Sequence, residues 1–187
     1  MEAGIEQSIK LIAGRLEDKE KRQDTLIPLT RQVVRECATS IKAMHADNLQ
    51  SAKEHLELAG KGLEELKRLS TGLEATGAVA PQEFVEASCL MAVFEKKALP
   101  KQDELGVDDL AYLNGLADCV GELRRELQLA LRRGDATEAE RYYDAMDAIY
   151  ENLMVIRFSS SLVGSLKRKQ DVARGQLEQA RSELLRK

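Results

Sequence analysis

Residues 108–134 of the chain read DDLAYLNGLADCVGELRRELQLALRRG, and this stretch decides the fold class. Its apolar residues recur at steps of three and four, which places them on one face of an α-helix. They are Leu113, Leu116, Val120, Leu123, Leu127 and Leu131. Gly134 follows the pattern, and glycine is favoured just past a helix end because it adopts the left-handed conformation without strain. The stretch is therefore predicted to be a helix that buries one face.

The rest of the chain carries the same helical spacing of apolar residues, and no part of it shows the alternation that is typical of a strand. Two loops are expected, at residues 72–77 and 100–106. The further predicted helices span about residues 5–44, 52–69, 81–97, 136–156 and 162–185. The chain is thus predicted to be all-α, a bundle of six to seven helices with long first and last helices.

Pro28 lies within the first helical stretch, just after the polar run from Glu17 to Asp24. Proline removes a backbone hydrogen bond and clashes with the preceding turn, so it kinks or ends a helix. Two interpretations stay open for this stretch: one long kinked helix, or two consecutive helices. Pro81 suits the first turn of a helix instead, because its missing N–H has no helical partner there in any case.

The length of 187 residues is enough for one sizeable core, so residues 1–187 are predicted to form a single domain. The cysteines, Cys37, Cys89 and Cys119, lack the spacing of a zinc or redox motif, which favours a reducing compartment. The first residues are charged and amphipathic, and no run is apolar enough to span a membrane. We therefore expect a cytoplasmic protein with no membrane partner.

The net charge of -4 argues against a generic nucleic-acid coat, because the whole molecule would attract phosphate weakly or repel it. Only a local basic surface would support such a role. Composition alone favours a helical scaffold with no nucleic-acid function.

Two carboxylates, Glu83 and Glu86, head the apolar stripe of the helix predicted over 81–97, where they share a sector with Leu90 and Phe94. A buried carboxylate costs several kcal/mol unless it is paired, protonated or bound to a cation. The alternative is that these acids simply reach solvent, because acids are favoured in the first turn of a helix by the helix dipole.

A second pair of carboxylates, Asp118 and Glu122, shares a helix face with Gly115, which would let a neighbouring helix or ligand come close. By itself this pair resembles an ordinary solvated surface. If the two pairs converge, their oxygen ligands select a hard cation, Mg²⁺ or Mn²⁺. Such a cation serves phosphoryl transfer, so phosphodiester cleavage becomes the natural candidate reaction.

Two segments carry a resemblance to a known family. Residues 81–87 (PQEFVEA) and 112–123 (YLNGLADCVGEL) resemble the two characteristic motifs of the translin/Trax family, and the likeness extends to residues 35–45, 134–135 and 166–184. The resemblance implies a seven-helix bundle that assembles into a hollow octamer, with RNA held inside and the acidic sites facing the cavity. If no partner chain exists, a homo-oligomer follows.

The acids decide which branch of the family the chain resembles. Trax-like subunits are Mg²⁺-dependent endoribonucleases, whereas translin-like subunits bind RNA or DNA without cleaving it and lack the aspartate of the second motif. Here the motifs supply Glu83 and Glu86, then Asp118 and Glu122, which the resemblance assigns to catalysis and to holding Mg²⁺ or Mn²⁺. A Trax-like enzyme of prokaryotic, archaeal type is expected, acting on single-stranded or partly duplex RNA. A translin-like oligomer that binds RNA or single-stranded DNA without catalysis is the alternative.

Basic residues on two helices are predicted to contact RNA. By resemblance these are Arg31, Arg35, Lys42 and His45 on the first helix, and Lys167, Arg168 and Lys169 at the start of the last. The family's common His-Arg pair is His45-Ala46 here, and His45 is expected to bind rather than to catalyse. Arg124 and Arg125 are expected to pair with acids of their own helix, such as Glu126. Cys119 lies beside the core stripe, where a free cysteine is usually inert.

Overall fold

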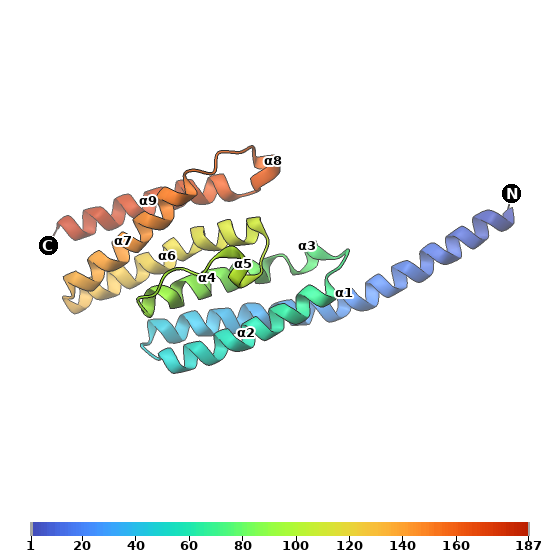
Figure 1. Ribbon diagram of the computed structural model, residues 1–187, viewed down its shortest axis with the longest axis horizontal. Coiled ribbons are helices and arrows are strands. Elements are labelled where there is room, and N and C mark those ends of the chain that lie inside the picture. The colour runs from blue at the N-terminus through green and yellow to red at the C-terminus, as the bar shows by residue number, and fades with distance from the viewer. Residues whose placement is uncertain (1, 187) are drawn as a thin grey trace.

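A computed structural model describes residues 2–186, which form nine α-helices and no strand (Figure 1). Six of these helices are long, and the other three are single turns of four residues. They are α1 (Glu2–His45), α2 (Leu49–Leu69), α3 (Glu74–Gly77), α4 (Val79–Phe94), α5 (Gln102–Leu105), α6 (Asp109–Arg133), α7 (Ala136–Leu153), α8 (Ser160–Val163) and α9 (Leu166–Leu185). The predicted all-α bundle is confirmed.

Helices α4 and α6 lie at the centre of the bundle (Figure 1). Helix α4 packs against α1, α2 and α6, and α6 packs in turn against α7 and α9. One apolar core runs through all of these contacts, and Leu63, Leu90, Leu123 and Leu166 are fully buried in it. The stripe of α6 predicted from spacing is confirmed where it is deepest, at Val120, Leu123 and Leu127, whereas Leu113, Leu116 and Leu131 are partly exposed.

Gly115 sets how closely the two central helices approach. A Cβ at this position would lie 2.6 Å from the carbonyl oxygen of Gln82 and 2.6 Å from the Cβ of Val85, both on α4. Real Cβ atoms do not come this close, so any larger residue would push α4 away from α6. The expected role of Gly115 is confirmed, and the neighbour that it admits is α4.

Side-chain caps define where several helices begin. Asn48, Asp108 and Asp135 each accept a hydrogen bond from a backbone N–H in the first turn of α2, α6 and α7, at 3.2, 2.9 and 3.0 Å. These bonds satisfy donors that have no partner inside the helix. Gly134, at φ 77°, ends α6 in the left-handed conformation, as its position after the apolar pattern predicted.

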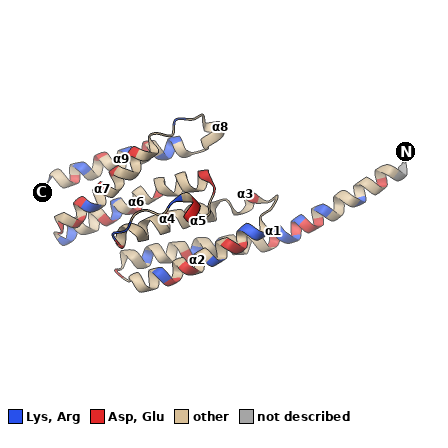
Figure 2. Cartoon of the chain, viewed as in Figure 1, with Lys and Arg blue, Asp and Glu red and all other residues tan. Residues whose placement is uncertain are grey.

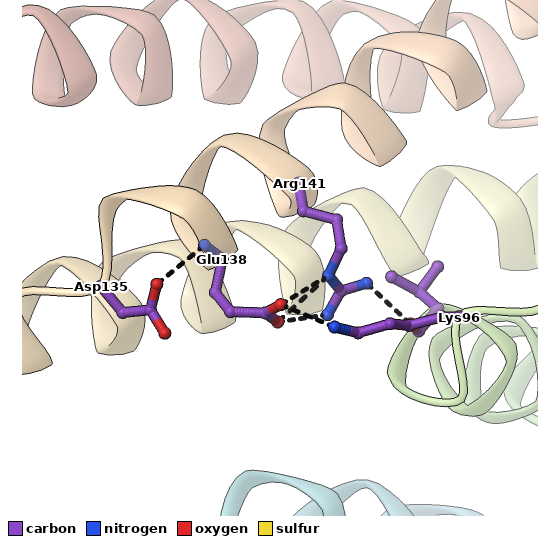
Figure 3. A network of polar contacts seen from close by, with 5 residues as sticks. Lys96, Asp135, Glu138 and Arg141 are labelled. Carbon is purple, nitrogen blue, oxygen red and sulfur yellow. Dashed lines mark hydrogen bonds and ion pairs between the residues drawn. The ribbon is translucent and has the colours of Figure 1, made fainter.

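A polar network ties α7 to the end of α4 (Figure 3). The guanidinium of Arg141 donates to both carboxylate oxygens of Glu138 and, through Nη1, to the carbonyl oxygen of Val93 at 2.8 Å. Lys96 adds a second cation to Glu138 at 3.1 Å, and together these bonds lower the pKa of Glu138 to about 2. The network thus fixes the start of α7 against the end of α4.

The first half of α1 projects from the bundle as a single helix (Figure 1). Residues 4–21 are exposed on every side, and Figure 2 shows basic and acidic residues intermixed along them. An apolar stripe nevertheless follows this arm, formed by Ile5, Ile9, Ile12 and Leu16. Of the two interpretations of the Pro28 region, the structure has one helix, which runs through Pro28 without interruption.

Other boundaries differ from the sequence predictions. The expected loops at 72–77 and 100–106 contain the single turns α3 and α5. The last helix starts at Leu166 rather than near Leu162, because Gly164, at φ 54°, separates it from α8. Its 20 residues make it shorter than α6, so the first helix alone is exceptionally long. Met1 and Lys187, the ends of the predicted 1–187 domain, lie outside the described residues. None of the described helices is both long and apolar enough to cross a membrane.

Candidate functional site

A cleft of about 550 Å³ opens between α4, α6 and α9. Its lining is acidic on the α4 and α6 side and basic on the α9 side. The polar residues that line it are Glu83, Glu86, Asp118, Ser165, Arg168, Lys169 and Gln176. Three of the four acids singled out from the sequence therefore share one cleft, and Glu122 lies one turn along α6 from Asp118.

The α4 acids sit in the cleft without a counter-ion. Within the described residues, neither Glu83 nor Glu86 accepts a hydrogen bond or forms an ion pair at its carboxylate, and Glu86 is only 9% exposed. Burial, together with the charges of Glu83, Asp118 and Glu122, raises the pKa of Glu86 to about 8. Burial and the charge of Asp118 also raise the pKa of Glu83. Glu83, Glu86 and Asp118 thus line one cleft, and the charges of Asp118 and Glu122 act on Glu86.

Asp118 faces the α4 acids across the cleft and is held by two donors. Lys169 of α9 places its Nζ 2.5 Å from Oδ2 of Asp118, and Gln82 of α4 donates to the same oxygen at 2.8 Å. The pair is partly buried, with 22% of the Lys169 side chain and 29% of the Asp118 side chain exposed. Asp118 thus joins three helices through one carboxylate oxygen.

Glu122 is held by a histidine from the end of α1. The ring of His45 lies between two α6 carboxylates, with Nε2 at 2.6 Å from Glu122 and Nδ1 at 2.5 Å from Glu126. The side chains of His45 and Glu126 are 5% and 2% exposed. Burial alone would lower the pKa of His45, but the bonds to both carboxylates outweigh it and raise that pKa to about 9. The bond from His45 lowers the pKa of Glu122.

The donor set suits a hard divalent cation, although the acids are not yet arranged around one. Carboxylate oxygens are the ligands that Mg²⁺ and Mn²⁺ prefer. In the described part of the chain, however, no group of three acid, histidine or cysteine side chains is close enough to coordinate a metal. Asp118 is instead turned to Lys169 and Glu122 to His45. The residues fit the cation, and two of them are held by cationic side chains of the chain itself.

The basic residues predicted to contact RNA fall into three positions. Arg31, Arg35 and Lys42 are exposed along the outward face of α1, and Lys167 is exposed on α9. Arg168 and Lys169 line the cleft beside the acids. His45 needs a correction: its ring is buried and both nitrogens face carboxylates, so it has no free donor for a phosphate.

Sequence reasoning missed Gln82, missed the role of Glu126 and misplaced the partner of Arg124. Glu126 is buried with His45, so it does not pair with arginines on its own helix. Arg124 instead reaches Glu183 of α9 at 3.0 Å, whereas Arg125 lies 4.0 Å from Glu122, an acid of its own helix, as expected. The i, i+4 spacing of Glu122 and Glu126 placed both on one face, but nothing local showed that a histidine lies between them.

All three cysteines are free and buried, and they take no part in the cleft. Burial raises the pKa of Cys37 and of Cys89 to about 12, and it also raises the pKa of Cys119 well above its usual value. Thiols with such pKa values stay protonated, and the expectation that Cys119 is inert packing agrees with its environment.

Comparisons with known proteins identify similar chains. No family model matches the sequence. An uncharacterised protein of Methanocaldococcus jannaschii is 33% identical over 174 residues, which cover 91% of this chain and 78% of that protein. Two structures of AfC3PO, one in complex with duplex RNA, share 33% identity over 95% of both chains, with TM-scores of 0.90 and 0.89. Apo-NeC3PO, at 20% identity over 95% of both chains and a TM-score of 0.86, shares the fold.

Proposed function

The chain belongs to the translin/Trax family of C3PO-type proteins, and from this premise we propose that it is a Trax-like, Mg²⁺-dependent endoribonuclease. Its substrate would be single-stranded or partly duplex RNA. The proposal is supported by its likeness, over 95% of both chains, to a C3PO solved with duplex RNA. The Trax-like assignment rests on Asp118, the residue that translin-like chains lack.

One observation carries the catalytic part of the proposal. Glu83 and Glu86 are held in a partly closed cleft without a counter-ion, and burial raises the pKa of both. Two such carboxylates do not serve stability, because burying them costs free energy that an apolar pair would not. A divalent cation removes that cost, since it supplies the missing positive charge.

The proposed chemistry divides between the cation and the chain. When bound, Mg²⁺ or Mn²⁺ would neutralise phosphate charge and make a water more acidic. Glu83, Glu86, Asp118 and Glu122 would hold the cation, and one of them would accept a proton from the attacking water. His45 would orient Glu122, which it contacts at 2.6 Å. Arg168, on the basic wall, is placed to bind the phosphate.

The proposed active form is a homo-oligomer, for which an octamer is the expected state. Ile5, Ile9, Ile12 and Leu16 present an apolar stripe that nothing in the described chain covers. A second copy would bury it, since exposed contiguous apolar surface of this kind marks an interface. Light scattering should give the mass of an octamer for the wild type and a smaller mass for Ile9→Glu. A monomeric wild type would contradict the assembly.

The experiment for the enzymatic claim is cleavage of an end-labelled RNA with partly duplex structure. Wild-type protein with Mg²⁺ should cleave it, whereas EDTA, Glu86→Gln and Asp118→Asn should each stop cleavage. The variants should still bind RNA, because they remove negative rather than positive charge. Equal cleavage by the variants, or no metal-dependent cleavage by the wild type, would overturn the proposal.

The second candidate function is an RNA-binding oligomer without catalysis. It is favoured by the observation that Asp118 and Glu122 are bound to Lys169 and His45 instead of being grouped around a metal position. Salt-sensitive RNA binding without cleavage, unchanged by Glu86→Gln, would select it.

A further inference from the structure

We propose that Lys169 acts as an internal competitor of the metal: its ammonium holds Asp118 in the metal-free cleft, is displaced by the divalent cation, and then contacts the RNA phosphate. The inference rests on the proposed function and assigns a specific role to one residue of the basic wall. Lys169 would therefore weaken metal binding while it promotes cleavage of RNA.

The first step of the argument is the position of the ammonium. Nζ of Lys169 lies 2.5 Å from Oδ2 of Asp118 and 3.5 Å from the carbonyl oxygen of Asn114. Gln82 donates to the same Oδ2, so this oxygen already has two donors and cannot also bind a cation. A metal that uses this oxygen must displace one of the two donors, and its positive charge repels the ammonium of Lys169 but not the neutral amide of Gln82.

The second step is the charge balance of the cleft. The charge of Lys169 acts on the two α4 acids as well, and it lowers the pKa of both Glu83 and Glu86 against the stronger effects that raise them. One ammonium thus offsets part of the negative charge that a divalent cation would offset, but it leaves Glu83 and Glu86 without a direct partner. A dication offsets more of this negative charge than one lysine can, and binding it makes Lys169 redundant at Asp118.

The third step is where the displaced side chain goes. Lys169 follows Arg168 on α9, and both line the cleft. The side chain of Lys169 is 22% exposed, so a flexible four-carbon stem can swing towards solvent without leaving a buried charge unpaired. An ammonium released beside Arg168 lies on the wall where a phosphate would be bound.

A purely structural role makes a different prediction. If Lys169 only links α6 to α9, replacing it would lower the stability of the fold and leave metal affinity unchanged. Lys167 gives a matched control, because it is exposed, lies two residues away on the same helix and does not line the cleft. Lys167→Met changes the net charge by the same amount, so it corrects for long-range attraction of the cation.

The test measures Mn²⁺ binding by titration calorimetry, without RNA, for the wild type, Lys169→Met, Lys169→Arg and Lys167→Met. Lys169→Met should bind Mn²⁺ about five- to tenfold more tightly than Lys167→Met does, a coupling of the size usual between linked sites. Lys169→Arg should stay near the wild type, which shows that the positive charge is responsible. Lys169→Met should also cleave RNA at least about tenfold more slowly than the wild type does, because the ammonium that would contact the phosphate is gone.

The outcomes separate this inference from the proposed function. If the wild type binds Mn²⁺ and cleaves RNA but Lys169→Met binds Mn²⁺ no more tightly than Lys167→Met, the competitor role is wrong and the enzyme assignment stands. If the wild type neither binds Mn²⁺ nor cleaves RNA, the proposed function fails and the competitor role fails with it. Tighter Mn²⁺ binding with unchanged cleavage would overturn the transfer of Lys169 to phosphate.

Discussion

His45 and Glu126 form a buried ion pair, with 2.5 Å between Nδ1 and Oε1, that joins the last turn of α1 to the middle of α6. Neither residue lines the cleft, and the other ring nitrogen of His45 holds Glu122 at 2.6 Å. The position and charge of a carboxylate in the candidate site are thus set by a contact that is itself out of solvent.

Removing Glu126 should destabilise the fold. Glu126→Ala leaves the His45 imidazolium buried with one partner fewer, and breaking a buried pair in this way costs about 3 kcal/mol or more. Glu126→Gln keeps the shape and one acceptor, so its cost should be smaller. The free energy of unfolding from urea titration checks both. Glu140→Ala, at an exposed position of α7, should change it by less than about 0.5 kcal/mol. Equal losses for Glu126→Ala and Glu140→Ala would contradict the pair.

The same pair predicts how stability depends on pH. The pKa of His45 is about 9 in the folded chain against 6.5 for a free histidine, so its contribution is full below pH 6.5 and is lost as pH rises through 9. The Tm of the wild type should therefore exceed that of His45→Gln most at pH 6, and the difference should shrink towards pH 9.5. A difference that is constant over this range would show that His45 is not charged in the fold.

Gly115→Ala should separate α4 from α6. The added Cβ would meet the Gln82 carbonyl oxygen at 2.6 Å, and overpacking of this kind costs about 1–3 kcal/mol. Because Glu83 and Asp118 face each other across the same contact, Mn²⁺ affinity should fall as well. Gly175→Ala is the control: nothing lies within 4 Å of its added Cβ, so it should stabilise α9 by about 0.5–1 kcal/mol. If Gly115→Ala and Gly175→Ala change stability and Mn²⁺ affinity in the same way, the close approach of α4 and α6 does not determine these properties.

The basic face of α1 should contribute to RNA affinity through charge alone. Replacing Arg31, Arg35 and Lys42 together by alanine should weaken binding to all RNA sequences. It should also reduce the slope of log K against log salt by about 0.7 to 0.9 for each phosphate that these side chains neutralise in the wild type. Filter binding over a range of salt concentrations measures both effects.

A matched triple variant on α2 controls for net charge. Lys53, Lys61 and Lys67 are each paired with an acid of the chain, so their replacement by alanine should leave the salt slope close to the wild-type value. If the two triple variants change the salt slope equally, the basic face of α1 has no special role in RNA binding.

The fold was predictable because its main signal is local. The spacing of Val120, Leu123 and Leu127 identifies a helix and its buried face whatever packs against it, and Gly134 ends that helix for reasons of backbone conformation. The sequence left the region of Pro28 ambiguous, because a proline is compatible either with a kinked helix or with the end of a helix. The structure has one helix that runs through Pro28.

The candidate site was predictable only in part, because it is built from contacts between helices. Spacing placed Glu83 and Glu86 on a buried face, but by itself it left Asp118 looking like solvated surface; the family motifs supplied the pairing. Nothing in the local sequence distinguishes Glu126 from a surface acid, since its partner His45 lies 81 residues earlier in the chain. Contacts at this separation require the fold.

The position of bound Mn²⁺ in crystals tests the central claim most directly. Anomalous diffraction from crystals soaked in Mn²⁺ should show a peak in the cleft, within coordination distance of carboxylates among Glu83, Glu86, Asp118 and Glu122, with the ammonium of Lys169 moved away from Asp118. The peak should be absent in Glu86→Gln crystals soaked in the same way. A wild-type cleft without a peak at saturating Mn²⁺, or a peak held by other residues, would contradict the account.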